Sequence, residues 1–135
     1  MSYEEQLGSI TLDADASIGI YTGVPGLPGS AKPNTGKQYC FVKVTGAHTA
    51  GLSTAAADKV VGILQNKPQM PGAAATVGVW GVSNVQVGGT FAAGDLVTAN
   101  AQGQAVKTTN AAEANAVALA PGSTVGSIVP VLIQR

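Results

Sequence analysis

The segment ATVGVWGVSNVQVGG, residues 75–89, decides the fold class. Its apolar side chains recur at every second position, which is the period of a β-strand and not of a helix. One face carries Val77, Val79, Val85 and Val87, and the other carries Trp80 and Val82. Gly78 and Gly81 flank the tryptophan and permit a β-bulge or the close approach of another backbone. We therefore expect a strand on which Trp80 either fills the core or anchors an interface.

Short strands are also predicted on both sides of this segment. They cover residues 38–45, 59–65, 95–109 and 125–133. Residues 59–65, KVVGILQ, are apolar on both faces, which predicts a central strand. Residues 95–109 predict a hairpin that turns near residues 101–103. Pro130 pushes the last strand, or at least that end of it, towards a sheet edge, because proline cannot donate to the ladder.

Two segments leave helix and non-helix open. Ser53 or Thr54 is placed to cap one turn of an Ala-rich helix, and a loop is equally compatible with the sequence. In residues 110–120, Asn110 and Glu113 have capping-box spacing, whereas the apolar residues alternate with alanines as in a strand. The chain is thus expected to hold at most one or two short helices.

The amino-terminal region has the pattern of an arm. Apolar side chains occupy the even positions Ile10, Leu12, Ala14, Ala16, Ile18 and Ile20. A strand of this kind has one dry face, so it must lie on an apolar surface of its own domain or of a neighbour. Residues 22–37 then alternate Gly and Pro, which excludes a helix or a central strand.

We therefore divide the chain into an arm with its connector, residues 1–37, and a body, residues 38–135. The predicted fold is mainly β. The body is a small β-sandwich or a barrel-like, β-tulip-like unit, and the arm before it is extended.

The charge composition limits the function classes. Of 135 residues, 10% are charged, against about 25% in a typical soluble domain. Lys plus Arg equals Asp plus Glu, so the zero net charge disfavours a nucleic-acid partner. No apolar run is long enough for a membrane span, and the acidic start MSYEEQ is unlike a secretory signal. A surface this poor in charge is typical of a subunit that its neighbours cover.

The sequence offers little for catalysis or metal binding. His48 is the one histidine and Cys40 the one cysteine, too few ligands for a protein zinc site. Cys40 lies mid-strand on an apolar face, where a thiol is usually inert. Asp13 and Asp15 share one strand face and form either an acid pair, a calcium site or a solvated surface. We expect no catalytic residue, no cofactor and no metal, and hence no enzyme.

Several motifs resemble the small β-rich head decoration, or cement, proteins of tailed bacteriophages, of the lambda type. The resemblance covers roughly residues 38–134 and rests on short motifs of common residues. They are Val61-Gly62-Ile63, Gly94-Asp95-Leu96-Val97 before a glycine hairpin, and the closing pair AVALA (116–120) with IVPVLI (128–133).

This resemblance implies a non-enzymatic virion protein on the outer surface of the expanded capsid, stabilising contacts between subunits of the major capsid protein. Such proteins often form trimers near three-fold axes, so we expect a homotrimer. The candidate contacts with the capsid or between subunits are Ile10, Leu12, Ile18, Ile20, Tyr21 and Trp80.

The sequence leaves two alternatives open. One is another virion role, as the base of a head fibre or as a tail protein. The other is a β-sandwich carbohydrate-binding module, which is disfavoured because the chain has only one Trp, three Tyr and two Phe.

Overall fold

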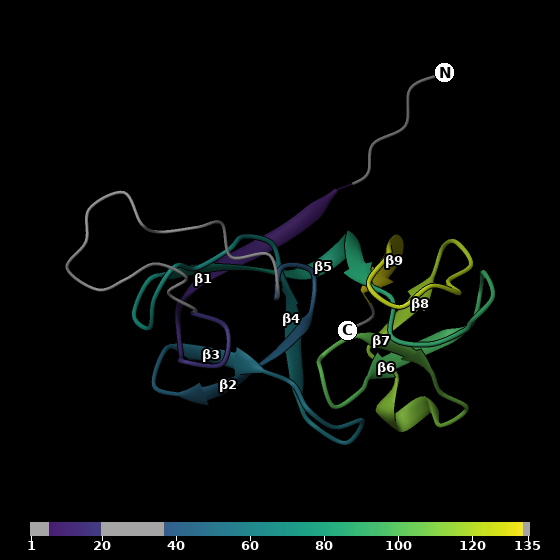
Figure 1. The fold of residues 1–135 in the computed structure, drawn as a ribbon, viewed down its shortest axis with the longest axis horizontal. Coiled ribbons are helices and arrows are strands. Elements are labelled where there is room, and N and C mark those ends of the chain that lie inside the picture. Colours follow the sequence, from purple (N-terminus) through teal and green to yellow (C-terminus); the bar gives the residue numbers. More distant parts are fainter. Residues whose placement is uncertain (1–5, 20–36, 134–135) are drawn as a thin grey trace.

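The segment with the two-residue period forms strand β5 (Ala74–Gln86), whose 13 residues link both halves of the molecule (Figure 1). A computed structural model describes residues 6–19 and 37–133. In it, the strands form one nine-stranded sheet, part of which closes into a five-stranded barrel. The fold is mainly β, as the sequence predicts. The alternation on β5 is also confirmed, because Val77 and Val85 are fully buried whereas Trp80 is exposed.

The barrel lobe consists of four strands and the first half of β5. The four are β1 (Leu7–Ala14), β2 (Phe41–Gly46), β3 (Thr49–Leu52) and β4 (Val60–Leu64). They follow the order β1-β3-β2-β4-β5, and pairing of β1 with β5 closes the ring. The barrel core is built from Leu12, Ala14, Ile18, Val42, Ala50, Leu64, Ala75 and Val77.

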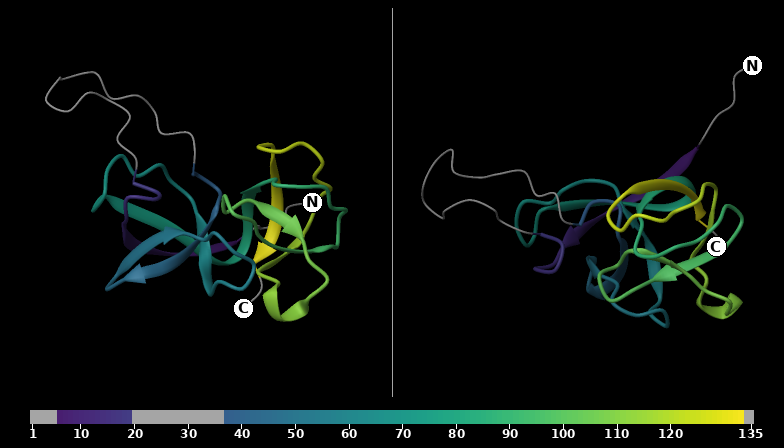
Figure 2. Two further views of the ribbon diagram at one scale, coloured as in Figure 1. Left: turned by 60° about the horizontal axis from the view of Figure 1, so that its bottom comes forward. Right: turned by 45° about the vertical axis from the view of Figure 1, so that its right-hand side comes forward.

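The second lobe continues the sheet from the other half of β5. It contains β6 (Leu96–Ala99), β7 (Ala105–Lys107), β8 (Ala116–Ala118) and β9 (Ile128–Ile133). They follow the order β5-β9-β8-β6-β7, and a bridge between Val87 and Ala105 brings β7 back to the end of β5. Figures 1 and 2 show the two lobes side by side, with β5 passing from one to the other.

Strands β2 and β4 form a wall between two hydrophobic cores. Val42 and Leu64 face the barrel core. Phe41 and Ile63 face the core of the second lobe. All four residues are at most 1% exposed, so both faces of the wall are buried. This confirms the prediction that residues 59–65, apolar on both faces, form a central strand.

The two segments for which the sequence left helix and non-helix undecided have different structures. Residues 110–120 hold both structures in succession, a short 3₁₀ helix (Ala111–Glu113) capped by the Asn110 side chain, and then β8. No helix forms after Ser53. Asp58 instead accepts hydrogen bonds from the backbone N–H groups of Thr54 and Ala55, at 3.0 and 3.2 Å, and closes a turn.

Strand β9 corrects part of the prediction for Pro130. The strand is internal, because it pairs with β5 along its whole length and with β8 from Val131 to Ile133. Pro130 lies just before the β8 ladder begins, where its missing N–H is not required. The proline therefore marks the end of one ladder and not an edge strand.

The apolar amino-terminal segment lies on its own domain, which settles the alternative left open above. Leu12 and Ile18 are buried in the barrel core, and β1 pairs with β5 from Leu7 to Asp13. Residues 20–36, which include Ile20, Tyr21 and most of the Pro/Gly connector, lie outside the described residues. The division of the chain at residue 37 stays a prediction.

Candidate docking surface

Cys40 and His48, the one thiol and the one imidazole of the sequence, lie apart. Cys40 precedes β2 and His48 lies in the turn after it, so the extended strand separates them by roughly 15–20 Å. Burial raises the pKa of the Cys40 thiol to about 11, which keeps it protonated near neutral pH. His48 is exposed, with a backbone φ of 55°. The two side chains cannot act as nucleophile and base.

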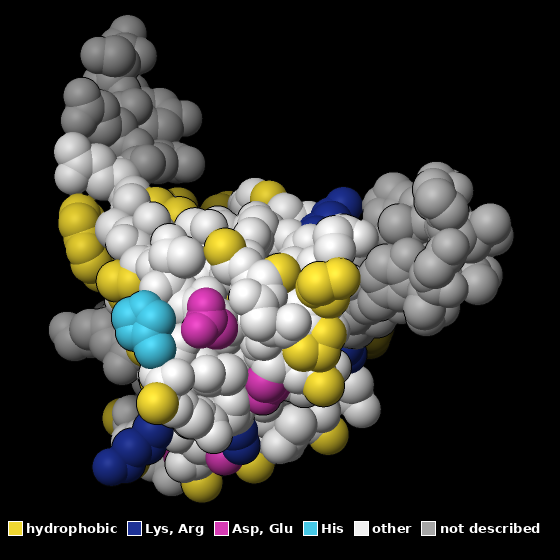
Figure 3. All heavy atoms as spheres, turned by 90° about the vertical axis from the view of Figure 1, so that its left-hand side faces the viewer, with side chains coloured by type: hydrophobic (Ala, Val, Ile, Leu, Met, Phe, Trp, Pro, Cys, Tyr) yellow, Lys and Arg dark blue, Asp and Glu magenta, His cyan; other side chains and the backbone are white. Residues whose placement is uncertain are grey.

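Asp13 lies on β1, whereas Asp15 follows the end of the strand and makes its own hydrogen bonds. Asp15 accepts hydrogen bonds from Ser17 and from the Thr45 hydroxyl, the latter at 2.8 Å. Burial raises the pKa of Asp15, but these hydrogen bonds outweigh it and hold the pKa below its usual value. Asp13 is exposed, and among the described residues no three His, Cys, Asp or Glu side chains are grouped to hold a metal ion. Figure 3 shows the face at the left of Figure 1, on the barrel lobe, where the charged side chains and the histidine are spread out and not clustered.

A row of apolar side chains crosses the outer side of the second lobe. Val82 pairs with Leu132, Leu132 with Val117, and Val117 with Leu96. Directly paired residues of antiparallel strands point to the same face, so the four side chains form one continuous row. Leu132 is 39% exposed and the other three are partly exposed.

Trp80 and Ile10 extend this row over β1. Gly8 pairs with Trp80, and a Cβ on Gly8 would overlap the indole ring, so the ring lies over this glycine. Ile10 is two residues further along β1 and faces the same side as Gly8. Trp80 is 51% exposed and Ile10 41% exposed.

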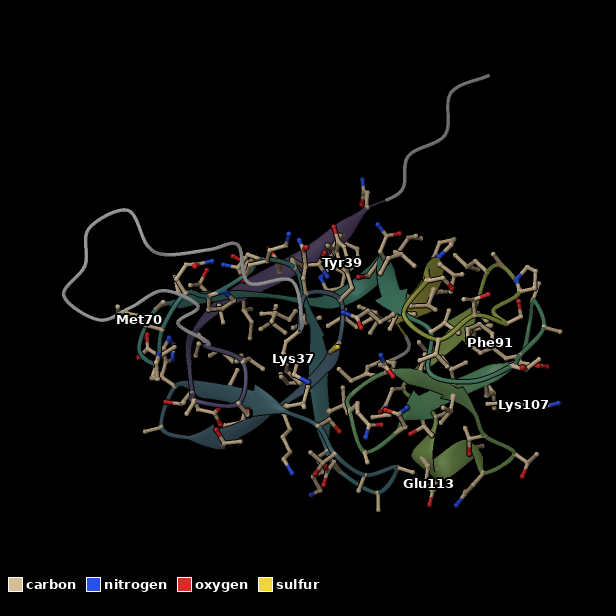
Figure 4. The ribbon with its side chains drawn as sticks, viewed as in Figure 1. Lys37, Tyr39, Met70, Phe91, Lys107 and Glu113 are labelled. Carbon is tan, nitrogen blue, oxygen red and sulfur yellow. The ribbon has the colours of Figure 1, made fainter. Side chains whose placement is uncertain are left out.

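We call these side chains together the apolar face. It consists of Ile10, Trp80, Val82, Leu96, Val117 and Leu132. Strands β5, β8 and β9 contain no charged residue, and β1 contains only Asp13 at its far end. Lys107 and Glu113 lie at the rim of the second lobe, and Lys107 points away from it (Figure 4). The apolar face is therefore neutral and suited to contact with another protein.

The six predicted interface residues have different outcomes. Ile10 and Trp80 are both exposed on the same side of the β1–β5 pair, as part of the apolar face. Leu12 and Ile18 face the protein's own core, at 7% and 0% exposure, and are not available to a partner in this fold. The sequence pattern did not predict four surface residues of this face, Val82, Leu96, Val117 and Leu132. Their signal was weak, because only the sheet register places these four scattered positions in one row.

The described part of the chain contains no helix with the length and apolar character of a membrane span. No protein-family model matches the sequence, and a comparison with curated proteins finds no match. Among solved structures, the fold is similar to the N base of the head fibre gp8.5 of bacteriophage phi29. The TM-score is 0.64 at 14% sequence identity, over 96% of this chain and 95% of the other. The likeness thus covers both lobes and concerns the fold.

Proposed function

We propose that this chain is a non-enzymatic structural protein of a bacteriophage head, which binds the outer surface of the expanded capsid. The observation that carries the proposal is the neutral apolar face, formed on a fold similar along its whole length to a phage head fibre base. The decoration-protein motifs of the sequence agree with this function. The major capsid protein is the proposed partner, and a homotrimer is the proposed form.

The apolar face explains how such a protein would bind. Ile10 and Trp80 offer side chains that are about half exposed in the free protein, so docking removes apolar area from water. The binding free energy from one contact of this size is modest. A trimer that engages several shell subunits at once gains effective concentration, and its binding is tight without a large single interface.

Stabilisation of the capsid follows from the same binding. A ligand that binds the assembled, expanded shell but not its separate subunits shifts the equilibrium towards that shell. The proposed effect is thus a clamp between neighbouring subunits of the major capsid protein. It needs no reaction chemistry, in agreement with the separation of Cys40 from His48.

A second candidate is the base of a head fibre. The similarity to the gp8.5 N base favours it directly. Both candidates bind the shell, but a fibre base supports a distal element and need not strengthen the shell. A carbohydrate-binding module has less support, because Trp80 is the one large aromatic side chain strongly exposed in the described residues.

Co-sedimentation with phage heads that lack the protein tests the proposal. The purified chain is mixed with compact precursor shells and with expanded shells, and the bound stoichiometry is measured. We expect saturable binding to expanded shells only, together with greater resistance of those shells to heat. Binding without a gain in resistance would favour the fibre base. Absence of binding to either shell would contradict both candidates.

A further inference from the structure

Among the described residues, strand β1 is paired along only one edge over most of its length. On one side it pairs with β5 from Leu7 to Asp13. On the other side it pairs with β3 only at Asp13 and Ala14. No described strand pairs with this second edge between residues 7 and 12.

The backbone hydrogen bonds show which groups this open edge presents. The Ala14 N–H donates to Ala73 O at 2.9 Å, on the β5 side. The Asp13 N–H donates in the opposite direction, to His48 O at 2.8 Å. Successive residues of a strand alternate in this way, so the odd-numbered Ser9 and Thr11 direct their N–H and C=O groups away from β5.

The open edge lacks the usual protection against pairing. Natural edge strands carry lysine, proline or inward-pointing charges that hinder the addition of another strand. The segment from Leu7 to Leu12, LGSITL, contains none of these. Ser9, Ile10 and Thr11 are all exposed, so a strand could approach without displacing a described residue. An edge of this kind is suited to be covered in an assembly.

We propose that an extended segment of the capsid shell protein binds to the open edge of β1 as an additional strand. Its backbone would pair with the outward-facing groups of Ser9 and Thr11, by the mode known as β-augmentation. This inference rests on the proposed function. The edge borders the apolar face at Ile10 and Trp80, so one partner can cover both.

The side chains beside the edge define the chemistry of the segment. The face with Ile10 and Trp80 is apolar, whereas Ser9 and Thr11 line the opposite, polar face. A matching strand therefore carries an apolar residue opposite Ile10 and uncharged polar residues on either side. A neutral segment suits best, because no described charged residue lies on β1 before Asp13.

Thr11→Pro tests the proposal, with Thr11→Ala as its matched control. Proline removes the outward N–H and fits an edge position, while alanine removes the side chain but keeps the N–H. With expanded shells as the probe, we expect Thr11→Pro to bind roughly tenfold or more weakly than Thr11→Ala, with both folded as judged by circular dichroism. Equal binding of the two variants would overturn the edge proposal and leave the proposed function standing.

Hydrogen exchange on the wild-type protein gives a second test that needs no substitution. The Ser9 and Thr11 amides should exchange quickly in the free protein and slowly on shells. The Ile10 amide, which faces β5, should be protected in both states. Unchanged exchange of Ser9 and Thr11 in shell-bound protein would overturn the proposal, as would a solution dimer that protects them. Failure of the wild type to bind shells would overturn the proposed function as well.

Discussion

Replacement of Trp80 by alanine tests the role of the apolar face. Trp80 is 51% exposed in the free protein, and docking would bury this exposed part. A fully buried aromatic side chain removes about 150–250 Å² from water, worth about 4–6 kcal/mol at about 25 cal/mol per Å². The exposed half therefore contributes about 2–3 kcal/mol to docking. At about 1.4 kcal/mol per factor of ten, Trp80→Ala should weaken shell binding by about 30- to 150-fold.

The same substitution should leave the protein folded. Trp80 belongs to neither hydrophobic core, and the covered half of its indole lies over Gly8 at the surface. The matched control is Met70→Ala, because Met70 is also 51% exposed but lies in the loop between β4 and β5, at the end of the barrel lobe (Figure 4). Met70→Ala should bind shells with the affinity of the wild type.

The assay has two parts. Titration of expanded shells followed by sedimentation gives the affinity of each variant. Fluorescence of the free wild-type protein reports the environment of Trp80 alone, since the chain has one tryptophan. We expect emission that acrylamide quenches readily. The reasoning is refuted if folded Trp80→Ala binds as tightly as the wild type, or if the emission is that of a fully buried indole.

Three predictions concern the fold. Gly81→Ala should destabilise the protein by more than Gly94→Ala. Both glycines have φ near +90°, but only at Gly81 would a Cβ overlap a backbone carbonyl. Urea unfolding compares the two variants, and equal losses of unfolding free energy would contradict this prediction. Cys40 should resist thiol reagents in the native state and react once the protein unfolds, and rapid native labelling would contradict its burial. Hydrogen bonds from the Thr54 N–H and Lys43 hold the pKa of Asp58 below its ordinary 3.8, so this stabilisation is present above that pH and is lost as pH falls below it. Asp58→Asn should therefore reduce the fall of the melting temperature as the pH is lowered. The same fall in the variant as in the wild type would contradict this prediction.

The sequence predicts strands most reliably where burial is one-sided or complete. The alternation on β5 places Val77 and Val85 inside and Trp80 outside, as observed, because a half-buried strand repeats every two residues. Residues 59–65 are apolar at nearly every position, and Ile63 and Leu64 do face separate cores. The hairpin of β6 and β7 also follows from the sequence, since Gly103 adopts a φ of +73° at the predicted turn.

Features that depend on distant partners were beyond sequence reasoning. The dry face of β1 does not reveal whether it covers its own barrel or a neighbour, and only pairing with β5 decides this. After Ser53, the sequence is compatible with an Ala-rich helix turn or with a loop. A loop forms, in which the Asp58 carboxylate accepts hydrogen bonds from the N–H groups of Thr54 and Ala55. The apolar face combines residues from β1, β5, β6, β8 and β9, so its existence depends on the register of the whole sheet.

Cryo-electron microscopy of heads with and without the protein tests the central claim most directly. We expect additional density on the outside of the expanded shell, with the two-lobed body oriented so that Trp80 and the open edge of β1 contact the shell protein. Absence of this density from the head, or its presence only on the tail, would contradict the proposed function.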